Sequence, residues 1–177
     1  MRYVVVGTAG SGKSTLSNEM ATLLACPHIE LDGMYWGPNW QAVPPDHFER
    51  AVQGAIAADR WIVDGNYSAV REIVWARATH IVWLNYGRAT ILSRVLLRTV
   101  RRAVQGTELS GGNRESLAMA FLSTDSILLD AHRSFSKNRR RFAKLRDDPR
   151  FDHLHWMEIT HAKHAVAFIE SLGRPSR

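Results

Sequence analysis

Short apolar segments alternate with longer amphipathic segments along the whole chain. Five of the apolar segments have the length and β-branched content of strands and lie at residues 3–6, 28–31, 61–63, 80–84 and about 153–159. The segments between them repeat apolar residues at three to four positions, which predicts helices at residues 14–24, 44–58, 68–75, 88–104, 114–132, 133–146 and 162–172. Such alternation indicates a parallel sheet with helices on both faces, so we expect one three-layer α/β domain over residues 1–177.

A glycine-rich segment joins the first predicted strand to the first predicted helix. It fits the phosphate-binding pattern G-x-x-x-x-G-K-[ST] at every fixed position, and the residues that we expect to bind the cofactor are Gly7, Ala9, Gly10, Ser11, Gly12, Lys13, Ser14 and Thr15. Glycines let backbone N–H groups turn toward a phosphate chain, and the start of the helix adds its positive end. We expect Lys13 to reach the β- and γ-phosphates of ATP and the Ser14 hydroxyl to ligate Mg²⁺. The alternative is a glycine-rich turn with an incidental Lys-Ser pair, and the flanking strand and helix argue against it.

Two aspartates follow predicted strands at the edge of the sheet where functional groups of parallel sheets gather. Asp64 ends the third predicted strand, a position from which an aspartate holds Mg²⁺ directly or through water. Asp32 ends the second predicted strand and could accept a proton from an acceptor hydroxyl or bind a polar edge of the acceptor. The alternative for each is a helix cap or a turn residue. We expect both at the catalytic centre.

Aromatic residues are dense in the segment 33–40, which its glycines and proline predict to be a loop. Tyr35, Trp36 and Trp40 could stack on a base or sugar ring of the acceptor, or could pack as a cover over the core. We take all three as candidates for binding the acceptor substrate.

Arginines are concentrated in and after the helix predicted at residues 88–104. A glycine-containing loop follows this helix, and we expect a lid at about residues 101–118. Phosphoryl transfer places charge on the transferring oxygens, so arginines brought in by a lid are expected to neutralise it. Arg98 and Arg114 flank the loop closely and are the candidates; a solvated helix face is the alternative for any single arginine.

Composition narrows the function classes. The formal net charge of +6 suits nucleic acid or phosphate-rich substrates, although an arginine-rich proteome would give the same balance. The single cysteine, Cys26, excludes an internal disulfide framework and fits the cytoplasm. The chain has no apolar segment of membrane-spanning length, so we expect no membrane partner.

Several short motifs together give the chain a resemblance to a known family. They lie at residues 30–32, 35–36, 38–40, 61–67 and 82–84, and the most specific are Pro38-Asn39-Trp40 and Asp64-Gly65-Asn66-Tyr67. In these motifs the chain resembles the DNA topology modulation proteins, which are small P-loop proteins close to adenylate kinase, over residues 4–115. The resemblance implies a nucleoside-monophosphate-kinase-like P-loop fold with a lid, and the use of ATP with Mg²⁺.

The resemblance also implies roles for further residues. Arg94 and Arg98 fall where adenylate kinases have arginines that contact the adenine face and the phosphates. The Phe-Pro-Arg motif that follows the aspartate–glycine pair in adenylate kinases is replaced here by Asn66-Tyr67-Ser68, and the next arginine is Arg71. We expect Asn66 and Arg71 at the acceptor, while the displaced arginine argues against AMP as that acceptor.

Two functions follow from the sequence. The first is an ATP- and Mg²⁺-dependent phosphotransferase that moves the γ-phosphoryl group to a small acceptor, such as a nucleotide or nucleoside. The second is an ATP-binding or ATP-hydrolysing switch protein associated with nucleic acid, although the chain has no helix-turn-helix or other reading motif. In either case we expect a monomer or a weak dimer.

Overall fold

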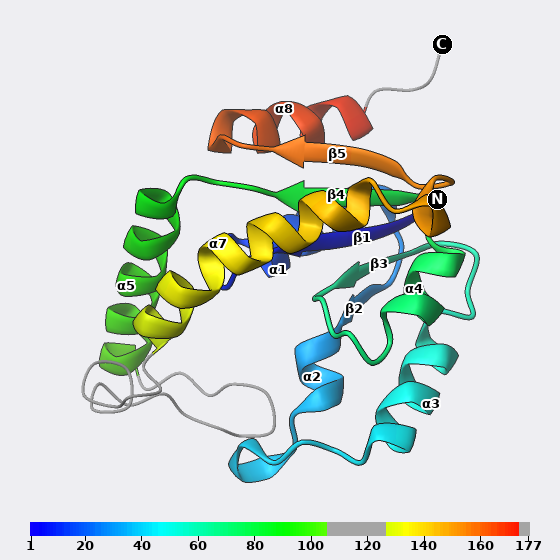
Figure 1. Ribbon diagram of the computed structural model, residues 1–177, viewed down its shortest axis with the longest axis horizontal. Coiled ribbons are helices and arrows are strands. Elements are labelled where there is room, and N and C mark those ends of the chain that lie inside the picture. The colour runs from blue at the N-terminus through cyan, green and yellow to red at the C-terminus, as the bar shows by residue number, and fades with distance from the viewer. Residues whose placement is uncertain (106–126, 174–177) are drawn as a thin grey trace.

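The computed structural model describes residues 1–105 and 127–173, and for residues 99–100, 102–105 and 127–134 it describes the backbone alone. Its centre is one sheet of five parallel strands (Figure 1). The strands are β1 (Arg2–Gly7), β2 (His28–Glu30), β3 (Trp61–Asp64), β4 (His80–Leu84) and β5 (His155–Ile159). Their order in the sheet is β2-β3-β1-β4-β5, which makes β1 the central strand.

Helices connect the strands and cover both faces of the sheet (Figure 1). The α-helices are α1 (Lys13–Leu24), α2 (Leu31–Tyr35), α3 (Pro45–Ala55), α4 (Arg71–Arg77), α5 (Arg88–Gln105), α7 (Ile127–Arg146) and α8 (Ala162–Leu172). Short 3₁₀ segments, η1 (Pro38–Trp40) and η3 (Pro149–Phe151), complete the described elements. The predicted three-layer α/β class with a five-stranded parallel sheet is confirmed.

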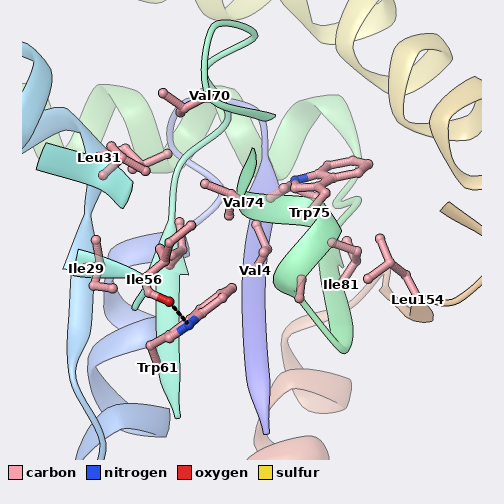
Figure 2. Close-up of a cluster of buried hydrophobic side chains, with 14 of the residues drawn as sticks. Val4, Ile29, Leu31, Ile56, Trp61, Val70, Val74, Trp75, Ile81 and Leu154 are labelled. Atoms are coloured by element: carbon pink, nitrogen blue, oxygen red, sulfur yellow. Dashed lines mark hydrogen bonds between the residues drawn. The ribbon is translucent and has the colours of Figure 1, made fainter. Parts of the chain in front are cut away.

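The alternation of side chains along β1 divides the core into two clusters, one on each face of the sheet. Val4 and Val6 belong to the first cluster, which buries residues of α3, α4 and α7, and Figure 2 shows part of it. Within this cluster the Trp61 indole N–H donates to the Ile56 carbonyl at 3.1 Å, so the buried ring has a partner for its only polar group (Figure 2). Tyr3 and Val5 belong to the second cluster, on the side of α1, α5 and α8.

The predicted boundaries differ from the structure mainly around the second strand. That strand was expected to extend to residue 31 and to be followed by a loop, but it ends at Glu30 and continues into α2 and then η1. Asp32 therefore lies in the first turn of a helix, and the prediction that it ends a strand is wrong. The pairing explains the shift, because Glu30 is the last residue of β2 that pairs with β3, opposite Asp64.

Candidate functional site

The P-loop lies at the carboxyl end of the central strand β1 and leads directly into α1. Within it the Ser11 N–H donates to the Thr8 carbonyl at 3.1 Å, which closes a tight turn. Gly10 sits in this turn with a φ of +80°, and a Cβ atom there would collide with the Val95 side chain of α5. The sequence therefore needs glycine at this position for both its backbone conformation and its close approach to α5.

Arg94 joins the P-loop to α5. Its Nη1 donates to the Ser11 carbonyl at 2.9 Å, and its guanidinium lies 4.5 Å from the centre of the Tyr86 ring. A charge-assisted hydrogen bond and a cation–π contact on one side chain hold the loop in this shape. The structure thus places Arg94, a predicted cofactor residue, beside the P-loop, where it braces the loop.

A cleft of about 920 Å³ opens in front of the P-loop. Residues 9–16 form one side of it, and Tyr86, Arg94 and Arg98 contribute from the β4 end and α5. The segment after β2 contributes Asp32, Trp36 and Trp40, and α8 closes a further side with small residues. A cavity of this size accommodates a nucleotide together with a small second ligand.

Glu30, which was not among the predicted site residues, lies beside Ser14, the predicted metal ligand. The Ser14 hydroxyl donates to Glu30 Oε1 at 3.3 Å, and Glu30 also lines the cleft. The apolar pattern predicts a strand that continues through residue 31, which places Glu30 inside the strand and not at its end. The glutamate at the true carboxyl end of β2 would have been found if the end of the strand had been placed one residue earlier.

Asp64 is 3% exposed and is the register partner of Glu30 on the neighbouring strand. Its Oδ2 atom has no hydrogen-bond partner among the described residues. His28 Nε2, the nitrogen that could pair with it if the imidazole were protonated, is 3.8 Å away. Because parallel register partners project from the same face of a sheet, Asp64 stands behind Glu30 on the side of α1. A buried carboxylate oxygen without a partner is suited to accept a hydrogen bond from water bound to a cation.

This donor set fits Mg²⁺ in a nucleotide site. Ser14, Glu30 and Asp64 offer only oxygen atoms, which Mg²⁺ prefers, and such sites take most of their remaining ligands from phosphates and water. No group of three or more histidine, cysteine, aspartate or glutamate side chains positioned for a metal occurs among the described residues. The protein's share of a Mg²⁺ site would therefore be small, as expected where the nucleotide supplies the rest.

Asp32 is held by Tyr67, a residue of the Asp64-Gly65-Asn66-Tyr67 motif. The Tyr67 hydroxyl donates to Asp32 Oδ1 at 2.6 Å. Burial, and after it the hydrogen bond to Asp32, raise the pKa of the Tyr67 phenol far above its ordinary value. The phenol therefore stays protonated and keeps one oxygen of the carboxylate fixed.

The three predicted aromatic residues divide between the core and the cleft. Tyr35 packs inward, with its ring centre 4.5 Å from that of Tyr67 and 5.2 Å from that of Phe48. Trp36 and Trp40 line the cleft, and their rings meet edge to face at a distance of 5.9 Å between centres. Of the two alternatives, packing on the core describes Tyr35, whereas the two tryptophans face the cleft and stay candidates for binding the acceptor.

Asn66 and Arg71 lie away from this cleft. The Arg71 Nε donates to Asn66 Oδ1 at 3.2 Å, and its guanidinium lies 5.8 Å from the centre of the Trp75 ring. Both residues line a separate cavity of about 10 Å³, too small for a ligand. The structure therefore places them in a packing role, whereas Arg98 lines the main cleft and Arg114 lies outside the described residues. Most of the predicted lid, residues 106–118, also lies outside them.

Comparison with solved structures relates this arrangement to known folds. The crystal structure of a gluconokinase from Sinorhizobium meliloti 1021 aligns with 97% of this chain and 93% of its own, with a TM-score of 0.51 and 16% sequence identity. The chain has a P-loop kinase fold. No protein-family model and no curated protein sequence matches the chain. The resemblance to DNA topology modulation proteins rests on the sequence motifs alone.

The brace on the P-loop can be tested by nucleotide binding. We expect Arg94→Met to raise the dissociation constant of ATP by about tenfold, because it removes a charge-assisted hydrogen bond of about 1.5–3 kcal/mol and a cation–π contact. Titration with a fluorescent ATP analogue measures this. Arg77→Met is the matched control, since Arg77 also donates to a backbone carbonyl, that of Ala57, but on α4 away from the cleft. Equal affinities of the two variants would contradict the role of Arg94.

Proposed function

We propose that this protein is an ATP- and Mg²⁺-dependent phosphotransferase that transfers the γ-phosphoryl group of ATP to a hydroxyl of a small molecule. The observation that carries the proposal is that one cleft contains both a P-loop and an exposed carboxylate beside two tryptophans. A site that only hydrolysed ATP would have no need of this carboxylate and these tryptophans, whereas a phosphotransferase must hold an acceptor next to the γ-phosphate.

The residues divide the chemistry between them. The N–H groups of the P-loop and Lys13 hold the triphosphate, and Arg98 is placed to neutralise charge that develops on the transferring group. Asp32 orients the acceptor hydroxyl and takes its proton as the oxygen attacks the γ-phosphorus. The new oxygen–phosphorus bond forms while the bond from the γ-phosphorus to the bridging oxygen breaks, and ADP leaves with that electron pair.

Ser14 and Glu30 would hold Mg²⁺, with Asp64 behind them, and the ion when bound supplies neutralisation of phosphate charge. The proposed setting is the cytoplasm, where ATP and Mg²⁺ are available. The described residues include no helix long and apolar enough to cross a membrane.

A second function, an ATP-dependent switch on nucleic acid, has one supporting observation. Basic residues of α7 are exposed, namely Lys137, Arg139, Arg140 and Lys144. Such a face could contact a phosphate backbone, and binding would then weaken steeply with salt. The kinase is preferred because the side of the cleft formed by Asp32, Trp36 and Trp40 has no role in a switch.

Lys13→Ala tests the transfer reaction itself. We expect it to lower acceptor-dependent ADP formation by about 10²-fold or more, because it removes a charge that stabilises the transferring phosphoryl group. A coupled ADP assay across sugars, nucleosides and nucleotides measures the rate and finds the acceptor. Lys144→Ala, an exposed lysine of α7, is the control. Substantial activity in Lys13→Ala, or ATP hydrolysis that no acceptor increases, would count against a phosphotransferase.

Glu30→Gln tests the unexpected metal-side carboxylate. We expect the Mg²⁺ concentration for half-maximal activity to rise by about tenfold, because a group that orients a metal ligand typically contributes that much to metal affinity. Activity should recover largely at saturating Mg²⁺. Glu49→Gln on α3, where Glu49 contacts Gln53 at the surface, should leave the Mg²⁺ dependence unchanged. The role fails if both variants titrate like the parent protein.

Tyr67→Phe tests whether Asp32 needs its partner. Loss of the hydrogen bond should lower kcat by about tenfold, since a hydrogen bond to a charged group contributes about 1.5–3 kcal/mol, while the KM for ATP stays constant. The ring itself remains to pack on Tyr35 and Phe48. Tyr3→Phe is the control, because the Tyr3 hydroxyl contacts only the Met1 sulfur at 3.3 Å among the bonds that the structure shows for it. An unchanged kcat, or a parallel rise in the KM for ATP, would refute the positioning role.

A further inference from the structure

The positive side chains of the cleft and Asp32 come from different elements of the fold. Among the described residues that line it, the cations are Lys13, Arg94 and Arg98. They belong to the P-loop and to α5, the helix that follows β4. Asp32 lies in α2, which follows β2, and the strand order puts β2 and β4 on opposite sides of β1. Figure 1 shows α2 and α5 at different sides of the carboxyl end of β1. Asp32 and α5 therefore approach the cleft from different sides of the P-loop strand.

Among the described residues, the segment that carries Asp32 brings no cation to the cleft. The segment 31–43, which supplies Asp32, Trp36 and Trp40 to the cleft, contains no lysine, arginine or histidine. Arg71, which the family resemblance suggests as the arginine at the acceptor, is instead hydrogen-bonded to Asn66. It lies over the Trp75 ring with its Nη2 atom buried. An acceptor phosphate or carboxylate would face the Asp32 carboxylate with no described positive partner beside it.

Residues 106–126, which include most of the predicted lid, carry more carboxylates than cations. Residues 106–126 contain one arginine, Arg114, and three carboxylates, Glu108, Glu115 and Asp125. An anionic acceptor is normally met by several arginines or lysines that neutralise it.

The two tryptophans lie in a segment whose backbone is preorganised by its own hydrogen bonds. The Gly37 N–H donates to the Gln41 carbonyl at 2.8 Å, and the Val43 N–H donates to the Tyr35 carbonyl at 3.0 Å. Between them Asn39 and Trp40 both adopt left-handed backbone angles, with φ of +55° and +56°. Bulky residues avoid this conformation unless the surroundings impose it, and such strain is concentrated at ligand-binding sites.

From these observations we propose that the acceptor is a hydroxylated ring compound without phosphate or carboxylate, such as a neutral sugar, an amino sugar or a nucleoside. Its ring stacks on Trp40 with Trp36 at its edge, and one hydroxyl donates to Asp32. The proposal rests on the proposed phosphotransferase and narrows its substrate. The hydroxyl oxygen bonds to the γ-phosphorus of ATP, its proton passes to Asp32, and ADP leaves with the electrons of the broken bond.

Matched pairs of acceptors test the charge rule. Glucose and glucuronate, ribose and ribose 5-phosphate, and adenosine and AMP keep the same ring and differ chiefly in an anionic group. Each compound is tested in two ways, by ADP formation with ATP and Mg²⁺ and by calorimetric binding in the presence of a non-hydrolysable ATP analogue. We expect the neutral member of the preferred pair to bind at least about tenfold more tightly than its anionic partner, since an anion held beside the Asp32 carboxylate is repelled by its charge.

The two readouts keep this inference separate from the proposed function. Selective binding of neutral members without turnover would support the acceptor site and refute the phosphotransferase. Preference for an anionic member in either assay would overturn the inference while leaving the phosphotransferase standing if ADP forms. Absence of binding by all compounds up to about 10 mM, a very weak affinity limit, would also overturn it.

Asp32→Asn tests the assigned cause. The substitution keeps the size of the side chain and removes its charge, so the preference for the neutral member should fall by about tenfold, because the repulsion is gone. Asp46→Asn, an exposed residue of α3 outside the cleft, should keep the parent ratio. Trp40→Ala should weaken both members equally, and Trp40→Phe should restore part of that loss. A ratio that Asp32→Asn leaves unchanged would overturn the role of its charge.

Discussion

The close approach of the P-loop to α5 is the constraint on which the site depends. Gly10 has no room for a Cβ atom beside Val95, and Arg94 reaches back across the same contact to the Ser11 carbonyl. The loop can therefore present its N–H groups only while α5 keeps its place, and α5 is fixed by burying Ile91 and Val95 in the core. The shape of the loop thus depends on packing between a loop and a helix that are about 80 residues apart in the chain.

The strand order then decides which chemistry faces which. Because β1 lies between β3 and β4, the chain crosses the P-loop strand when it passes from β3 to β4. Side chains that follow β2 and β3 meet the P-loop from one side, and those that follow β4 meet it from the other. Glu30, Asp32 and the two tryptophans come from the first group, and Arg94 and Arg98 come from the second. The sheet topology therefore sets from which side each of these residues enters the cleft.

The sequence predicted the parts of the structure that depend on contiguous residues. The P-loop is a local motif, and β4 and α8 end where their apolar patterns end, so these were placed correctly. The end of β2 was misplaced because it depends on pairing between Glu30 and Asp64, which are 34 residues apart. The position of Arg71 could likewise not be predicted from the sequence. Its hydrogen bond to Asn66 and its contact with the Trp75 ring are set by packing.

The motif Asp64-Gly65-Asn66-Tyr67 shows how four adjacent residues serve separate parts of one site. Asp64 faces α1 behind the proposed Mg²⁺ ligands, and Tyr67 holds Asp32, the proposed acceptor carboxylate. Gly65 permits the turn between them, with a φ of +126° and the Leu31 Cβ atom 3.0 Å from where its own would be. Because Leu31 directly precedes Asp32, the same packing that requires glycine also fixes the helix that carries Asp32. A change at this turn would therefore disturb both proposed sides of the site, because one short piece of backbone positions them.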